Sequence, residues 1–145
     1  MDFIPVNEPL LNGNEKKYLC ECIDSGWISS EGPFVKEFEE KMSKRAGRKY
    51  GIAVSNGTAA LEIAVQAIGI QEGDEVIMPT FTIISCAMAV TKLGGVPVLI
   101  DSDLTTWNMK ADEIEARITK KTKAIMVVHL YGLPVVMDKI LEVAQ

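Results

Sequence analysis

YGIAVSNGTAALEIAVQAI, residues 50–68, changes its apolar pattern half-way along. Residues 50–54 form a short apolar run rich in β-forming side chains, which predicts a buried strand. Residues 58–68 instead place apolar side chains at helical spacing, which predicts a helix. The helical positions are Leu61, Ala64, Val65 and Ile68. The rest of the chain is organised around this strand and the helix that follows it.

The turn between these two elements has the sequence Ser55-Asn56-Gly57-Thr58. Small and hydroxyl-bearing residues at a helix start leave its first backbone N–H groups free, and glycine lets a ligand approach the backbone. The helix dipole favours negative charge at the same point. The turn therefore predicts a phosphate-binding site at Asn56, Gly57 and Thr58. The alternative is that Ser55 or Asn56 serves only as an N-cap.

Flanking segments continue the alternation of strand and helix patterns. Before the central segment we expect two helices, one from Asn12 or Asn14 to Asp24 and one from Pro33 through Met42. After it we expect strands over residues 75–78, 97–100 and 124–128, and helices over 85–93, 112–118 and from 134 or 138 onward. This order predicts an α/β fold with a mostly parallel sheet covered by helices on both faces.

Length and composition limit the class of protein. The chain has 145 residues, of which 48% are hydrophobic and 24% charged, as expected for one globular domain with a core. The net charge of −5 argues against nucleic acid as the main partner. No apolar segment reaches membrane-spanning length, and residues 1–10 lack the features of a signal peptide. We therefore expect a cytoplasmic protein, no membrane partner and three reduced cysteines.

Polar or turn-forming residues follow each predicted strand. In parallel sheets ligands bind at the carboxyl ends of strands, here residues 55–58, 79–82, 101–103 and 129–132. The single histidine, His129, could titrate near neutral pH, but we favour a hydrogen-bonded structural role for it. Asp101 and Asp103 have no further ligands nearby, so we expect turn or capping roles and no metal site.

Several motifs occur together and in one order along the chain. They are NGNE (12–15), GWISS (26–30), SNGTAAL (55–61), GDEVI (73–77), TKKTKAI (119–125) and VHLYG (128–132). In these motifs the sequence resembles the amino-terminal part of the DegT/DnrJ/EryC1/StrS nucleotide-sugar aminotransferases, and is most similar to their perosamine- and viosamine-synthase branch. The resemblance covers essentially the whole chain, but well under half of a family member.

The resemblance implies a pyridoxal 5'-phosphate (PLP) enzyme of the aspartate-aminotransferase fold, fold type I. Such an enzyme moves an amino group, usually from glutamate, to a keto carbon of a nucleotide-linked 4-keto-6-deoxy sugar for cell-surface polysaccharides. It works as a homodimer with active sites at the interface. The chain would then be part of the PLP-binding large domain, with residues 1–48 forming helices and a substrate-side loop, and residues 49–145 the alternating core.

The family's functional positions map onto a few residues here. The resemblance implies that Asn56, Gly57 and Thr58 hold the cofactor phosphate. Ile83 occupies the position that faces the cofactor ring, where an aromatic residue is common, and neighbouring Phe81 belongs either to this cofactor site or to the core. The loop with Trp27, Ser29 and Ser30 lies near the sugar nucleotide in the family. Alternatively, Trp27 packs to anchor that loop.

No catalytic residue is assigned within residues 1–145. The family's Schiff-base lysine, and the aspartate that faces the pyridinium nitrogen, are expected beyond Gln145. In the family, strands from later in the chain also separate residues 50–54 from the other three strands. We therefore interpret the chain as truncated, and expect it alone to be inactive and poorly folded or re-paired with another copy.

Two other function classes stay open at this point. A nicotinamide-dependent oxidoreductase or sugar epimerase requires a glycine fingerprint after the first strand, whereas residues 55–60 contain one glycine. A non-catalytic binding or interaction module from a split aminotransferase gene is consistent with the missing lysine. PLP binding without turnover would favour that second class.

Overall fold

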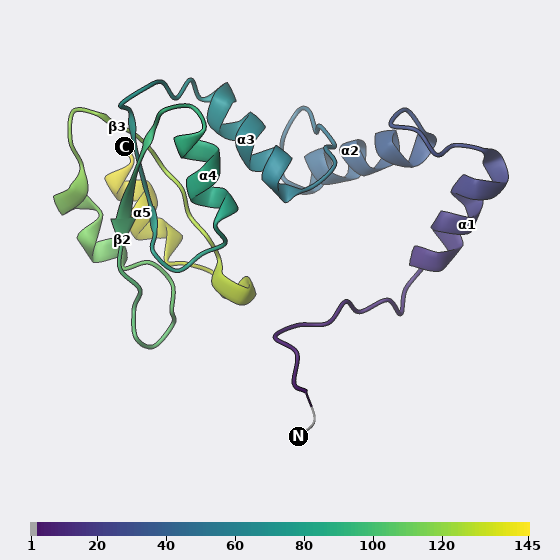
Figure 1. Cartoon of the computed structure of the whole chain (residues 1–145), viewed down its shortest axis with the longest axis horizontal. Coiled ribbons are helices and arrows are strands. Elements are labelled where there is room, and N and C mark those ends of the chain that lie inside the picture. The colour runs from purple at the N-terminus through teal and green to yellow at the C-terminus, as the bar shows by residue number, and fades with distance from the viewer. Residues whose placement is uncertain (1–2) are drawn as a thin grey trace. The chain divides into compact units, whose positions relative to one another are not determined.

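The computed structural model describes residues 3–145 and divides the chain into two compact units, Met1–Ala53 and Val54–Gln145 (Figure 1). The first unit contains α1 (Glu15–Ser25) and α2 (Pro33–Arg45). α1 ends at Gly26, whose φ of 75° is the left-handed conformation that glycine adopts without penalty. α2 begins with Pro33 in its first turn, because proline has no N–H to lose there. Both predicted helices are confirmed.

The second unit alternates helices with parallel strands. Its elements are α3 (Gly57–Ala67), β1 (Glu75–Pro79), α4 (Ser85–Thr91), β2 (Val96–Ile100), β3 (Thr122–Ile125) and α5 (Met137–Val143), with three 3₁₀ turns, η1 (Ala111–Glu113), η2 (Glu115–Arg117) and η3 (Leu130–Gly132). The strand order is β2-β1-β3, and β1 pairs in parallel with both neighbours. This confirms the predicted parallel α/β architecture.

Helices cover both faces of this sheet, and Figure 1 shows α4 and α5 beside the strands. Successive side chains of β1 point to opposite faces. Val76 and Met78 pack into one cluster with Val65, Ala89 and Val90 of α3 and α4. Ile77 packs into the other cluster, whose buried members include Ile100, Met109, Ile114, Val135 and Ile140. The two clusters therefore hold the sheet from its opposite faces.

The prediction of a strand over residues 50–54 is wrong. A strand needs a neighbour for its backbone hydrogen bonds, and within residues 3–145 the only named strands are the three that pair with each other. Gly51 and Ala53 lie against α2 instead, where the Ala53 N–H donates to the Glu39 carboxylate at 2.8 Å. Gly51 approaches so closely that an added Cβ would lie 2.5 Å from the Glu39 carbonyl oxygen. An apolar run indicates that a segment can form a strand, but it does not indicate which partner the segment meets.

The predicted helix over residues 112–118 is also wrong, because this segment forms the separate turns η1 and η2. Of its two apolar anchors, Ile114 is fully buried whereas Ile118 is 43% exposed. Short helices depend on a packed face for stability, and a single buried residue provides too little. The next strand starts two residues earlier than predicted and ends at Ile125 rather than at residue 128.

Within residues 3–145, no helix has the length and apolar character needed to cross a bilayer.

Candidate cofactor-phosphate site

The predicted phosphate turn opens α3. Asn56 has an extended backbone, with φ −166° and ψ 171°, and its side-chain oxygen accepts from the Ala59 N–H at 2.9 Å. This is the N-cap geometry that the sequence left open as an alternative. The cap satisfies the third amide of α3 and leaves those of Gly57 and Thr58, which precede any intrahelical acceptor. Asn56 is therefore an N-cap, and its contact with phosphate stays a prediction.

Gly57 faces open space at the first position of α3. A Cβ added there would meet no atom within 4 Å, and the residue has no positive φ. Neither the backbone conformation nor a described neighbour therefore requires glycine. The open space would let a ligand approach the backbone here, and that role stays a prediction. Partial positive charge at a helix start makes an anion the suitable ligand.

Ser85 joins Thr58 at this site. The Thr58 and Ser85 hydroxyls lie 3.0 Å apart, and both residues are half-buried. Ser85 is the first residue of α4, which follows the carboxyl end of β1. The contact therefore places the start of α3 at the ligand-binding edge of the sheet. Sequence reasoning missed Ser85, although a hydroxyl residue at the start of a predicted helix was the available signal.

The two residues predicted to contact the cofactor ring lie in the loop from β1 to α4 and have different surroundings. Phe81 is 42% exposed and packs against Trp107, with ring centroids 5.7 Å apart. Phe81 therefore lies outside the buried core clusters, and its contact with the cofactor stays a prediction. Ile83 is 66% exposed and lies two residues before Ser85. An exposed aliphatic side chain next to the phosphate turn could cover one face of a cofactor ring, and this role stays a prediction.

Trp27, Ser29 and Ser30 lie in the first unit, between α1 and α2. Trp27 is 49% exposed. Together with Ser29 it lines a cavity of about 320 Å³ that is otherwise formed largely by apolar residues of the two helices. Trp27 thus borders the cavity without being buried, and the choice between loop anchor and substrate contact stays open. The predicted contact of these three residues with a sugar nucleotide stays a prediction.

Carboxylates after β2 are engaged in local structure. One Asp103 oxygen accepts from the Thr106 N–H at 2.8 Å, the Thr105 N–H at 3.0 Å and the Thr106 hydroxyl at 3.0 Å. These hydrogen bonds, the Thr106 amide first, lower the pKa of Asp103 below its usual value. Asp101 accepts from the Ser102 N–H at 2.8 Å and pairs with Lys110 at 3.6 Å. The predicted turn roles of both residues are confirmed.

The loop after β3 contains the single histidine. His129 accepts a hydrogen bond at Nδ1 from the Val135 N–H at 3.1 Å, which confirms the predicted structural role.

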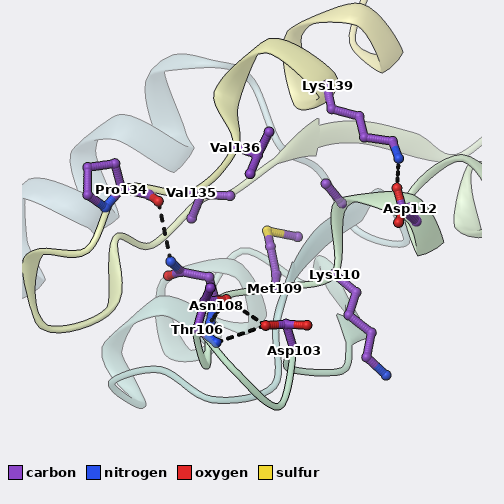
Figure 2. Close-up of a pocket in the computed structure, with 11 residues that line it drawn as sticks. Asp103, Thr106, Asn108, Met109, Lys110, Asp112, Pro134, Val135, Val136 and Lys139 are labelled. Atoms are coloured by element: carbon purple, nitrogen blue, oxygen red, sulfur yellow. Dashed lines mark hydrogen bonds and ion pairs between the residues drawn. The ribbon is translucent and has the colours of Figure 1, made fainter.

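A separate cavity of about 410 Å³ lies between the segment after β2 and the start of α5 (Figure 2). Its lysines are already paired: Lys139 with Asp112, and Lys110 with Glu113 at 3.3 Å. The Glu113 hydrogen bond is the main cause of a raised Lys110 pKa. Because these cations have carboxylate partners, the cavity is a poorer anion site than the start of α3.

Comparison with known proteins identifies the family. Residues 9–145 match the DegT/DnrJ/EryC1/StrS aminotransferase family. The chain belongs to this family. It is 50% identical over 145 residues to GDP-perosamine synthase of Escherichia coli O157:H7, and 52% identical over 142 residues to GDP-perosamine synthase of Caulobacter vibrioides. These alignments cover 100% and 98% of the chain, but 40% and 38% of the relatives. The chain thus spans about two-fifths of their length.

Solved structures agree with this assignment. The crystal structure of NtdA from Bacillus subtilis with bound cofactor PMP superposes with a TM-score of 0.81 and 38% sequence identity. The superposition covers 89% of this chain and 29% of that chain. The predicted fold class, the large-domain architecture of PLP-dependent aminotransferases, is therefore confirmed. The NtdA structure contains PMP, which agrees with the cofactor expected from the sequence.

Proposed function

We propose that the protein carrying this chain is a PLP-dependent aminotransferase. Its substrates are glutamate, as amino donor, and a nucleotide-linked 4-keto-6-deoxy sugar, as acceptor. The proposal includes a cytoplasmic homodimer that makes precursors of cell-surface polysaccharide. Family membership and 50–52% identity to GDP-perosamine synthases support the reaction class and favour a GDP-linked sugar.

One observation in the structure carries the cofactor assignment: the open, glycine-bearing start of α3. The Gly57 and Thr58 amides come before any intrahelical acceptor, and the Asn56 cap is already used by Ala59. A phosphate dianion placed there would accept two backbone hydrogen bonds and interact favourably with the helix dipole. The residues present therefore fit a cofactor phosphate.

Two hydroxyls extend the same site. Thr58 and Ser85 lie 3.0 Å apart, so one of them can donate to the other while the second donates to a phosphate oxygen. Hydrogen bonds to an ionised acceptor are shorter and stronger than neutral ones. The pair would therefore fix the position of the phosphate, and with it the depth at which a cofactor enters.

When bound, PLP supplies an electron sink for amino transfer. The described residues would bind and orient it: the start of α3 would hold the phosphate, and Ile83 would pack on the ring. An aliphatic side chain lacks the additional aromatic stacking term of about 0.5–1.5 kcal/mol. Phosphate binding must consequently contribute a larger part of the cofactor affinity than in a site with an aromatic residue at this position.

The test uses the protein as its native source produces it. Purified protein is incubated with PLP, glutamate and a GDP-linked 4-keto-6-deoxyhexose, and the products are identified by mass spectrometry. We expect an amino sugar nucleotide together with 2-oxoglutarate. Cofactor binding is followed separately by PLP absorbance. Binding without amino transfer would support a non-catalytic module instead, and absence of PLP binding would refute the cofactor assignment.

A further inference from the structure

Asn108 is a buried polar side chain with an unusual set of partners. The residue is 5% exposed. Among residues 3–145, Asn108 is the only polar or charged residue that is buried. Its Oδ1 accepts from the Leu130 N–H at 3.0 Å. Its Nδ2 donates to the Leu133 carbonyl at 3.0 Å and reaches the Pro134 carbonyl at 3.5 Å, a contact drawn in Figure 2. One carboxamide therefore joins the segment after β2 to three backbone groups of a segment more than twenty residues away.

These three groups belong to the loop of residues 129–134, which we call the η3 loop. Within it Tyr131 has φ 48° and ψ 26°, a left-handed conformation that L-residues with large side chains rarely adopt. Gly132 follows with φ 86°. The His129 side chain closes the loop by accepting from the Val135 N–H. A left-handed tyrosine persists only where surrounding contacts determine the backbone, and Asn108 supplies three of those contacts.

Tyr131 is not covered by any other part of the described residues. The side chain is 79% exposed. The loop follows the carboxyl end of β3, which neighbours β1 in the sheet. The carboxyl end of β1 leads to the segment with Ile83 and Ser85. Parallel strands bring these two loops to the same, ligand-binding edge.

We propose that Asn108 is a positioning residue whose carboxamide fixes the η3 loop so that Tyr131 stands at the ligand-binding edge of the sheet and contacts the sugar-nucleotide substrate. A phenol offers an apolar ring and a hydroxyl, which suits a sugar ring and its hydroxyl groups. The inference rests on the proposed aminotransferase function for the identity of the ligand. The hold of Asn108 on the loop rests on the structure alone.

The first test measures amide hydrogen exchange in the native protein and in Asn108→Ala. We expect exchange at Leu130 and through the η3 loop to rise about tenfold, because the side chain that anchors these groups is gone. Exchange in β1 (Glu75–Pro79) should stay unchanged. Equal increases in β1 and in the loop would show a general core role and overturn the inference, as would an unchanged loop.

Asn108→Asp is the matched control. A carboxylate can still accept from the Leu130 N–H, but it cannot donate to the Leu133 and Pro134 carbonyls. We expect the Leu130 amide to keep its protection, while the amides of Leu133 and Val135, on either side of Pro134, exchange faster. If Asp and Ala variants behaved alike at Leu130, the assignment of the individual hydrogen bonds would be wrong.

The second test separates positioning from stability through kinetics. Asn108→Ala and Tyr131→Ala should each raise KM for the nucleotide sugar about fivefold, with kcat and PLP affinity changed by less than about twofold. The KM of the double variant should not exceed that of either single variant, because both substitutions remove the same contact between Tyr131 and the substrate. Additive effects, or an unchanged KM, would overturn the role of Tyr131. If the wild type shows no amino transfer, the proposed function fails, and the exchange experiment still decides whether Asn108 fixes the loop.

Discussion

Residues 50–54 and β1 (Glu75–Pro79) are both short apolar runs, yet only β1 is a strand. β1 has a parallel neighbour on each side, and four of its five residues are buried. Tyr50 and Ile52 are 74% and 77% exposed, and their segment lies along α2. The two runs differ in their partners rather than in their intrinsic preference. β-propensity is expressed only where a neighbouring strand completes the backbone hydrogen bonds.

The largest expected effect comes from truncating matched isoleucines in the two runs. Ile77 is fully buried in the centre of β1. Ile77→Ala should lower the free energy of unfolding by about 2–5 kcal/mol, because it removes buried area and leaves a cavity. Ile52→Ala should change it by no more than about 0.5 kcal/mol. Urea unfolding of both variants measures the difference. A comparable loss at Ile52 would mean that residues 50–54 have a partner in the native protein.

Alanine substitutions at two glycines compare a packed and an open position, with smaller expected effects on stability. A Cβ at Gly95 would lie 2.8 Å from a Val90 methyl and 3.1 Å from the Val90 carbonyl oxygen, whereas one at Gly57 would meet nothing within 4 Å. Gly95→Ala should therefore lower the free energy of unfolding by about 1–3 kcal/mol. Gly57→Ala should leave it unchanged or raise it by about 0.4–1 kcal/mol. Thermal and urea unfolding of the two variants measure both effects, and equal losses would contradict the difference in packing.

A larger substitution at Gly57 tests PLP binding separately from stability. Gly57→Leu should weaken PLP binding by tenfold or more, on the order of 1.4 kcal/mol, because the side chain fills the space of the phosphate. Titration of the apoprotein with PLP, followed by absorbance, measures the affinity, and urea unfolding provides the stability control. Unchanged affinity in a folded variant would remove the phosphate site from the start of α3.

The smallest effect concerns pH and the turn after β2. The pKa of Asp103 is lowered by hydrogen bonds from Thr106 and Thr105 in the folded state. Its stabilising contribution is therefore complete above the pKa of the unfolded chain, about 3.9, and is lost as the pH falls through the lower folded value. Thermal unfolding between pH 7 and pH 3 should show a shallower acid loss for Asp103→Asn than for the wild type. Parallel curves would contradict this account.

Most local features of the chain were predictable from its residues. Pro33 and Gly26 mark helix ends for steric reasons that hold in any context, and apolar patterns located β1, β2, α3 and α4. The motifs indicated the family as well, because they follow one another in a fixed order along the chain. The failures, at residues 50–54 and 112–118, are segments whose outcome depends on what packs against them.

The candidate site also has features that the local sequence predicts and contacts that depend on the tertiary structure. The sequence by itself determined the turn at Asn56, Gly57 and Thr58, because the preferences of small and hydroxyl residues at a helix start are local. Only the tertiary structure decided that Ser85 reaches Thr58, that Phe81 packs on Trp107, and that Asn108 holds the η3 loop. These contacts join residues about twenty or more positions apart. These contacts form because the parallel sheet brings its loops together. Patterns within a short stretch of sequence do not indicate which distant residues will meet.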